Sequence, residues 1–373
     1  MEVHVYIRNL LFSLLIFLCL LLNGCWDQRL LSELFIAIGT SIEKQDDKLI
    51  TRYAFVAEEQ GKQKIEVIVT EAGTLKGNDT KVNQYMDGIF SPSDISYTIM
   101  SSEVVKKHDL LSLFSVDYMS SSNVLRLIPV VTNDSIKDIF HIIETKNDYK
   151  YTTELLEDAA YDTLTTSTNL QKLLPFLYDP SMDFTLPYIS IDQNKIKVSG
   201  VALFHNKMYT GTTLLDDDAT FFLLLSNQKG KRAQMEVNIS QNDQPFFIVV
   251  EVKKSKSKIN IEHIKGKNIK ASIHLFLQVF ILETSNVNQY SKYETSFEKM
   301  LENYFTTKAN LIINTLQKAN CDAFGIGREL KAYHLNTWKQ LQLDWGKHYQ
   351  SVIIEPHVKV EVINKSLMDF NER

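Results

Sequence analysis

Several protein classes depend on residues of which this 373-residue chain has few. Its 13 glycines and 7 prolines are too few for a collagen-like chain, a disordered chain or a glycine-rich nucleotide-binding fold. The formal net charge is −5 and no domain is strongly basic, which argues against nucleic acid as the main partner. The chain has no HExxH, GxSxG, Walker-type or GxGxxG motif, and its nine histidines show no paired metal-ligand spacing. We therefore expect no enzymatic activity, no cofactor and no bound metal.

Long apolar runs are equally scarce, and the one that stands out covers residues 10–22. Its thirteen residues are interrupted only by Ser13 and Cys19, and Arg8 precedes it. This is the length of the apolar region of a secretory signal, whereas a membrane-spanning helix needs about 20 apolar residues. The run therefore predicts an export signal and not a membrane span.

The signal ends in Leu22-Asn23-Gly24-Cys25, and a cysteine directly after Leu-x-Gly is the pattern of a bacterial lipoprotein cleavage site. We expect residues 1–24 to be removed and Cys25 to carry a diacylglyceryl group on its thiol and an acyl group on its amine. Each buried methylene contributes about 0.8 kcal/mol, so two or more chains anchor a protein stably where one does not. The alternatives are a simple secreted protein and a short buried helix.

Cys321 is the remaining cysteine of the mature chain. If Cys25 carries lipid, no internal disulfide can form, and the fold depends on its hydrophobic cores. Without an assigned histidine partner, Cys321 is more typical of a packed residue than of a nucleophile.

The first half of the mature chain mixes strand and helix patterns. Residues 35–42 and 49–56 predict a hairpin across the polar turn 43–48. Pro129 favours a sheet edge for the strand at 125–131, because proline donates no hydrogen bond to a neighbouring strand. The other expected elements are strands at 64–70 and 94–100 and helices at 102–114, 136–143 and 170–177, of which the last contains Pro175.

Proline and turn residues then cluster at Asp179-Pro180, at Pro187 and at residues 192–194, which favours a domain boundary near residue 190. We therefore expect an N-terminal domain at 25–190 and a C-terminal domain at 191–373.

The second half predicts an antiparallel meander followed by helices. The triplet at 216–218 is all Asp, lacks the spacing of a calcium loop and indicates a helix N-terminus instead. Apolar residues at three- and four-residue steps predict a helix at 294–318 that packs on the sheet. The other expected elements are a hairpin at 196–209, strands at 246–252, 259–261, 269–282 and 352–362, a break at 322–327 and a helix at 328–343.

Seven lysines belong to the connections of this expected meander. They suit an anionic membrane surface or a solvated edge that resists aggregation, and we favour the second. They are Lys253, Lys254, Lys256, Lys258, Lys265, Lys267 and Lys270. Together the patterns predict an α+β fold with mixed and antiparallel sheets and packed helices, in two or three subdomains after the signal peptide.

Three stretches of the chain resemble the Ger(x)C family, the C-subunit lipoproteins of bacterial spore germinant receptors. The first is Cys25-Trp26-Asp27 with residues 29–34, and the second is the lysine-studded segment 250–259. The third is Asp322-x-x-Gly325-x-Gly327 followed by Trp338, by Asp344-Trp345 and by the strand at 358–362. The order of the three stretches extends over essentially the whole mature chain.

The resemblance implies a noncatalytic, lipid-anchored subunit on the outer face of the spore's inner membrane. Its expected partners are two polytopic membrane subunits that sense small nutrients, and it leaves open which subunit binds the nutrient. Of the matched positions, only Cys25 is implied as a chemical site. Asp322, Gly325 and Gly327 are implied as a structural turn, since glycine adopts backbone angles that other residues resist.

Two other functions compete with this one. A hydrolase could be built from residues distant in sequence, and a solute-binding lipoprotein could deliver a small ligand to a transporter. The second class typically has repeated βαβ units and a central cleft, whereas this sequence predicts antiparallel meanders.

Overall fold

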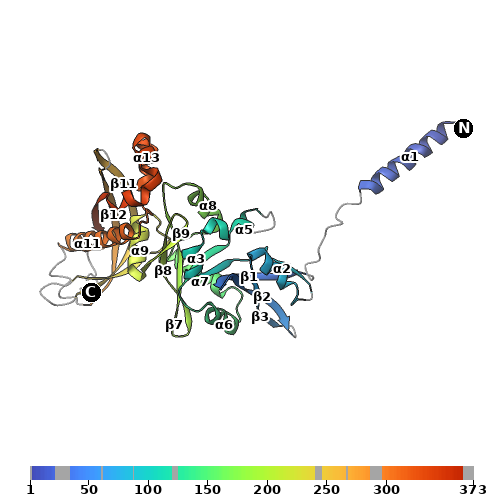
Figure 1. Cartoon of the computed structure of the whole chain (residues 1–373), viewed down its shortest axis with the longest axis horizontal. Coiled ribbons are helices and arrows are strands. Elements are labelled where there is room, and N and C mark those ends of the chain that lie inside the picture. Colours follow the sequence, from blue (N-terminus) through green and yellow to red (C-terminus); the bar gives the residue numbers. More distant parts are fainter. Residues whose placement is uncertain are drawn as a thin grey trace, which may run out of the picture.

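The computed structural model describes residues 2–21, 34–59, 62–86, 88–119, 125–239, 246–265, 268–285 and 296–363. Within them the chain forms a nine-stranded sheet and a four-stranded sheet, each packed with helices. The two sheets follow one another along the long axis of the molecule (Figure 1). The fold is therefore α+β with mixed sheets, as the sequence predicts.

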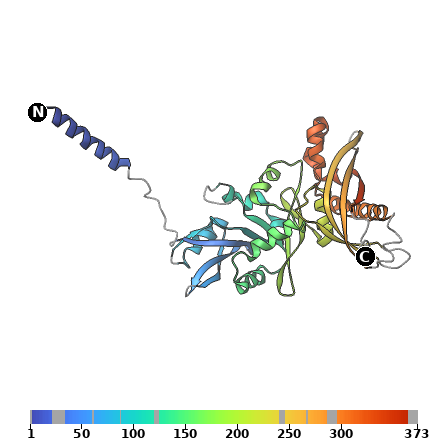
Figure 2. The ribbon, with the colours of Figure 1, turned by 180° about the vertical axis from the view of Figure 1, so that it is seen from behind.

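The apolar run lies in α1 (Glu2–Leu21), a helix set apart from the folded body in both views (Figures 1 and 2). Residues 4–14 of α1 are exposed. In the described ranges, no helix reaches the combination of length and apolar character that crossing a membrane requires.

The large sheet has antiparallel ends and a parallel centre. Strand order is β3-β2-β1-β5-β6-β7-β8-β9, with β4 beside β1. The centre consists of four mutually parallel strands in the order β1-β5-β6-β7. The antiparallel hairpins β1–β2 and β7–β8 extend the sheet on either side of this centre. The strands are β1 (Leu34–Gln45), β2 (Lys48–Glu59), β3 (Lys62–Ala72), β4 (Ile89–Ser91), β5 (Tyr97–Ser101), β6 (Ile128–Thr132), β7 (Phe184–Asp192), β8 (Lys195–His205) and β9 (Met208–Leu215).

Helices cover both faces of the large sheet. One core gathers Phe55, Phe114 and Phe204 with α2, α3, α4 and α8, and the other gathers Ile99, Phe140 and α7. The helix predicted at 170–177 forms despite Pro175. The helices of this part are α2 (Leu75–Val82), α3 (Ser102–Lys107), α4 (Leu110–Leu113), α5 (Ser115–Met119), α6 (Ile136–Lys146), α7 (Tyr151–Tyr161) and α8 (Leu170–Tyr178).

Two predictions for this part are wrong in an instructive way. Pro129 lies in β6, a central strand, and is tolerated because β6 pairs with β7 only from Val131 onward. The helix expected at 102–114 is divided at His108, because the Asp109 carboxylate caps α4 by accepting a hydrogen bond from the Ser112 N–H at 3.0 Å.

Two of the three residue groups that favour a boundary near 190 lie in a hairpin. Pro187 lies within β7, and Gln193 and Asn194 form the β7–β8 turn with φ of 46° and 59°. Strands β8 and β9 then continue the large sheet to Leu215. The division of the chain at residue 190 stays a prediction.

The small sheet has the order β10-β11-β12-β13, with β13 parallel to β12. Its strands are β10 (Gln234–Asn238), β11 (Phe247–Lys265), β12 (Asn268–Thr284) and β13 (Ile353–Val362). Helices α9 (Asp216–Leu225), α11 (Phe297–Lys318), α12 (Ile326–Tyr333) and α14 (Trp345–Gln350) contribute to its core, and α13 (Leu335–Leu341) and η2 (Gln342–Asp344) connect the last two. Side chains of α11 also cap β13, since Glu302 and Glu298 accept hydrogen bonds from the N–H groups of Val360 and Val362 at 3.4 and 3.1 Å.

The two strand pieces expected at 246–252 and 259–261 are one strand, β11. Irregularities in its pairing at Val252/Lys254 and Ile261/His263 interrupt the alternation of side chains. Six of the seven lysines expected in connections therefore lie on strands, and Lys267 lies outside the described residues. The six are Lys253, Lys254, Lys256, Lys258, Lys265 and Lys270. The expected helix at 328–343 is likewise divided, at His334 between α12 and α13.

The three aspartates at 216–218 lie in the first turn of α9, as predicted. Asp216 pairs with Lys197 at 2.9 Å and Asp218 with Lys308 at 2.7 Å. The N-cap residue is Leu215, without a side-chain cap, so the acids act through the helix dipole and these lysines.

Candidate functional site

Cys25, the one chemical site that the sequence predicts, lies outside the described residues, which resume at Leu34. Its lipidation stays a prediction. The candidate site that the structure does describe is the turn Asp322–Gly327, where the two sheets meet.

The Asp322 carboxylate is fully buried and accepts four hydrogen bonds. Its Oδ1 accepts from the N–H groups of Gly325 and Ile326, each at 2.9 Å. Its Oδ2 accepts from Gly327 N–H at 2.7 Å and from Trp345 Nε1–H at 2.9 Å. The carboxylate therefore caps the N-terminus of α12, where free N–H groups and the helix dipole favour an anion.

Asp183, directly before β7, joins this turn to the large sheet. Its Oδ2 accepts from Asp322 N–H at 2.8 Å, and its own N–H donates to Asp322 O at 3.1 Å. The same carboxylate lies 2.9 Å from His205 Nδ1, at the end of β8. Residues 139 positions apart thus hold the two sheets together.

Glycines allow the close packing of this junction. Gly325 has a φ of 83°, a left-handed conformation that glycine adopts without strain. A Cβ on Gly327 would lie 2.7 Å from both Ser181 O and Trp345 Nε1 and 2.9 Å from Trp338 Cζ3. The motif predicted as a structural turn is therefore a buried joint that has no room for a side chain.

Electrostatics at the joint reflect its burial. Burial raises the pKa of the Asp322 carboxyl to about 7, while the N–H donors of Gly327, Ile326 and Trp345 act in the opposite direction. Burial also raises the pKa of the Cys321 thiol well above its ordinary value. A protonated, fully buried thiol is a packed group, as the sequence predicts, and a poor nucleophile.

This arrangement serves structure more than chemistry. Both Asp322 oxygens are occupied by protein donors, and the imidazole of His205 contacts the Asp183 carboxylate and the Asn206 amide. The joint therefore presents neither an activated nucleophile nor an open coordination position.

A second cluster, which sequence reasoning missed, lies on the small sheet. Glu262, His274 and His357 are exposed, and one ligand atom from each lies within 4.8 Å of the others. The two imidazole rings stack with centroids 4.9 Å apart. They meet because His274 on β12 pairs with His357 on β13, a parallel register that sequence spacing does not reveal.

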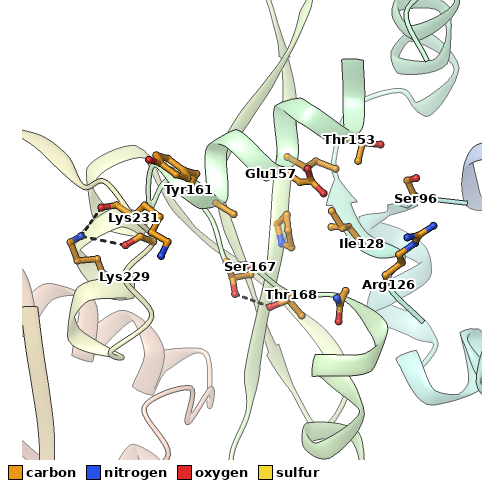
Figure 3. Close-up of a pocket in the computed structure, with 16 residues that line it drawn as sticks. Ser96, Arg126, Ile128, Thr153, Glu157, Tyr161, Ser167, Thr168, Lys229 and Lys231 are labelled. Carbon is orange, nitrogen blue, oxygen red and sulfur yellow. Dashed lines mark hydrogen bonds between the residues drawn. The ribbon is translucent and has the colours of Figure 1, made fainter. Parts of the chain in front are cut away.

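A pocket with a volume of about 840 Å³ lies where β5 and β6 begin. Figure 3 shows Arg126 and Lys231 at opposite ends of its wall. Lys229 Nζ donates to the carbonyls of Gly230 and Lys231 at 3.3 and 3.1 Å, and Arg126 lies 3.6 Å from Asp94. Lys229 and Arg126 thus have partners within the protein, and Lys231 lies far from Arg126 (Figure 3). These cations do not converge on one point where a ligand would bind, so the pocket lends no support to a solute-binding role.

Comparison with known protein families gives two matches in chain order. The family described as spore germination protein N-terminal domain matches residues 27–191. The family described as spore germination B3/GerAC like, C-terminal, matches residues 199–366.

Two curated relatives agree with these matches. Spore germination protein GerQC of Bacillus cereus is 25% identical over 222 residues, which are 59% of this chain and 60% of that protein. Putative spore germination protein YfkR of Bacillus subtilis (strain 168) is 20% identical over 370 residues, 92% of this chain and 94% of that protein. Among solved structures, the crystal structure of the GerBC protein has a TM-score of 0.59 at 14% identity and covers 87% of this chain and 97% of its own. At that identity the structural likeness shows the fold alone.

Proposed function

This chain belongs to the Ger(x)C family of spore germination proteins, and from that premise we propose that it is the lipid-anchored, noncatalytic subunit of a bacterial spore germinant receptor. The observation that carries the proposal is the tandem match of two spore germination domains at 27–191 and 199–366, directly behind the predicted lipidation site Cys25. Its proposed partners are two polytopic membrane subunits, and its proposed place is the outer face of the spore's inner membrane.

Anchoring gives the folded domains a simple physical advantage. Lipid at Cys25 would confine them to the membrane surface, where the effective concentration of integral partners is high and modest interfaces suffice. The buried joint at Asp322 fits this role, because it fixes the two sheets relative to each other as one binding surface. A noncatalytic role is supported by the match to the spore germination family.

Replacing Cys25 by Ala tests the anchor. In spores carrying Cys25→Ala we expect loss of the lipid-modified protein and a germination response to nutrients close to that of a deletion strain. The matched control is Cys19→Ala, six positions upstream in the segment expected to be removed, which should germinate like the wild type.

Mass spectrometry of the wild-type N-terminus separates the anchor from the apolar helix α1, which could retain an uncleaved chain. We expect a first residue Cys25 that carries diacylglycerol. An N-terminus upstream of Cys25, or undiminished germination with Cys25→Ala, contradicts the anchoring role.

Crosslinking in intact spores tests the partners. Capture of two polytopic membrane proteins supports the receptor assignment, and capture of a soluble enzyme in their place contradicts it.

A further inference from the structure

The face of β11, β12 and β13 opposite the helices is open and carries unpaired positive charge. Core residues such as Ile273, Leu275 and Leu277 point toward α9 and α11, whereas His274 between them is exposed. Alternation along a strand sends every second side chain to this outer face.

Register places basic residues side by side in two neighbouring rows of that face. In the first row Lys258 pairs with His274, and His274 pairs with His357. Directly paired residues have Cβ atoms about 4.5–5.5 Å apart, so the three side chains are adjacent.

The second row repeats the pattern two residues along each strand. Lys256 pairs with Phe276, and Phe276 pairs with Lys359. The rows are separated by about 7 Å, two residues of an extended strand.

Together the two rows line a hollow of about 370 Å³, which we call the basic hollow. Its walls contain three lysines and two histidines and no carboxylate. The lining residues are Lys256, Lys258, His274, Leu275, Phe276, His357, Val358 and Lys359.

Two other lysines of this sheet have acidic partners. Lys253 pairs with Glu251 at 2.8 Å, and Lys270 pairs with Glu262 at 3.3 Å and Glu355 at 2.9 Å. Among described carboxylates, by contrast, none lies within ion-pair distance of the lysines of the hollow. The ammonium groups of Lys256, Lys258 and Lys359 therefore lie around the hollow without a described acidic partner, and an anion placed between them would neutralise part of their charge.

We propose that the basic hollow binds a phosphate group. Three ammonium groups and two imidazoles offer N–H donors to its oxygens, and charge-assisted bonds of this kind are about twice as strong as neutral ones. Phe276 provides an apolar floor. The phosphate can belong to a lipid headgroup or to a soluble phosphate compound, since the recognising chemistry is the same. The proposal rests on the sheet alone and does not require lipid at Cys25.

The neighbouring Glu262–His274–His357 cluster raises the opposite possibility, a divalent cation. Two histidines and a glutamate are a ligand set that zinc accepts. The Ser272 hydroxyl and the Lys270 ammonium, however, already engage Glu262 and lower its pKa. Lys258, paired with His274, adds a positive charge beside any metal. The observations therefore favour the anion, and zinc binding becomes an outcome of the test.

The lipid arm of the test compares vesicles of phosphatidylcholine with vesicles that also contain phosphatidylglycerol. The full chain is used, because α1 and any lipid anchor act equally on both vesicle types and cancel in the comparison. A lysine near an anionic surface contributes about 1 kcal/mol, or about fivefold in affinity. The triple variant Lys256→Gln, Lys258→Gln, Lys359→Gln should therefore lose roughly 100-fold of the preference for phosphatidylglycerol.

The matched control removes the same charge elsewhere. Lys107→Gln, Lys137→Gln, Lys339→Gln changes three exposed lysines on helices that do not line the hollow and should keep the preference of the wild type. Circular dichroism checks that both triple variants fold. If the hollow variant does not fold, Lys256→Gln alone, with an expected loss of about fivefold, replaces it.

The soluble arm titrates inorganic pyrophosphate into the detergent-solubilised full chain by calorimetry, and zinc in a separate run. Loss of pyrophosphate binding in the hollow variant alone identifies a soluble phosphate, and loss of the phosphatidylglycerol preference in that variant alone identifies a lipid. Either result supports the proposal. Equal behaviour of the two triple variants in both arms, or zinc binding without phosphate binding, overturns it.

Discussion

Gly327→Ala should destabilise the joint between the sheets by about 3 kcal/mol, although alanine ordinarily favours a helix. Gly327 lies in the first turn of α12, an element in which Gly→Ala usually stabilises by about 0.4–1 kcal/mol. Here the new Cβ would lie 2.7 Å from the backbone oxygen of Ser181 and from Trp345 Nε1.

The magnitude follows from what cannot move. The Ser181 contact is a backbone atom, and Trp338 and Trp345 are 2% and 4% exposed, so the rings have no free space. Overpacking of a filled core costs about 1–3 kcal/mol. Displacing Trp345 also removes a hydrogen bond to the Asp322 carboxylate, of a kind that contributes about 1.5–3 kcal/mol. Subtracting the helix preference leaves about 3 kcal/mol.

Urea unfolding of the full chain measures this effect, with tryptophan fluorescence as the probe because Trp338 and Trp345 lie at the joint. At a slope of about 3 kcal/mol per molar urea, the midpoint should fall by about 1 M. The control is Gly73→Ala, where a Cβ would meet nothing within 4 Å, and its midpoint should stay near that of the wild type. Equal midpoints for the two variants would refute the close-packing argument.

Two further predictions concern titration and packing. The pKa of Asp322 is raised from 3.8 to about 7, so the stability that it contributes is present below about pH 4 and lost as the pH rises through 7. The unfolding free energy of the wild type should therefore fall between pH 4 and pH 8 relative to that of Asp322→Asn, and parallel plots of the two free energies against pH would contradict this. Gly39→Ala places a Cβ 2.1 Å from Cζ of the buried Tyr97 and should cost about 3 kcal/mol in the same urea assay; Tyr97→Leu in the same chain should recover part of the loss, and no recovery would mean that the ring is not the obstacle.

Local patterns in the sequence predict the elements whose partners are near in the chain. The hairpins β1–β2 and β8–β9 follow from alternation around polar turns. The apolar repeat predicts the helix α11, its end at Lys318 and its packing on the sheet. These patterns lie within a short stretch of sequence, so they can be recognised without knowledge of distant contacts.

Features set by distant partners are not predictable in this way. The central position of β6 depends on β7, which begins 52 residues after β6 ends (184 − 132), and Pro129 alone points to the wrong place in the sheet. The continuity of β11 is hidden because pairing irregularities shift the side-chain alternation. The rule that every second residue of a strand points to the same face fails across a bulge for the same reason.

The joint was partly predictable. The resemblance of Asp322, Gly325 and Gly327 to a family signature predicts a turn, and the structure shows the carboxylate that makes it. Nothing in the sequence connects Asp322 with Asp183, because a contact across 139 positions leaves no local pattern. Cys25 lies outside the described residues, so its role stays a prediction.

The parallel placement of β13 beside β12 means that the small sheet is completed only late in synthesis. The ribosome releases β12 well before β13, and until Ile353–Val362 emerges, one edge of β12 and part of the apolar surface of α11 have no cover. Contacts of such long sequence separation form slowly, and uncovered edges invite aggregation and proteolysis. A chain that stops short of β13 should therefore be more open to aggregation and proteolysis than the full chain.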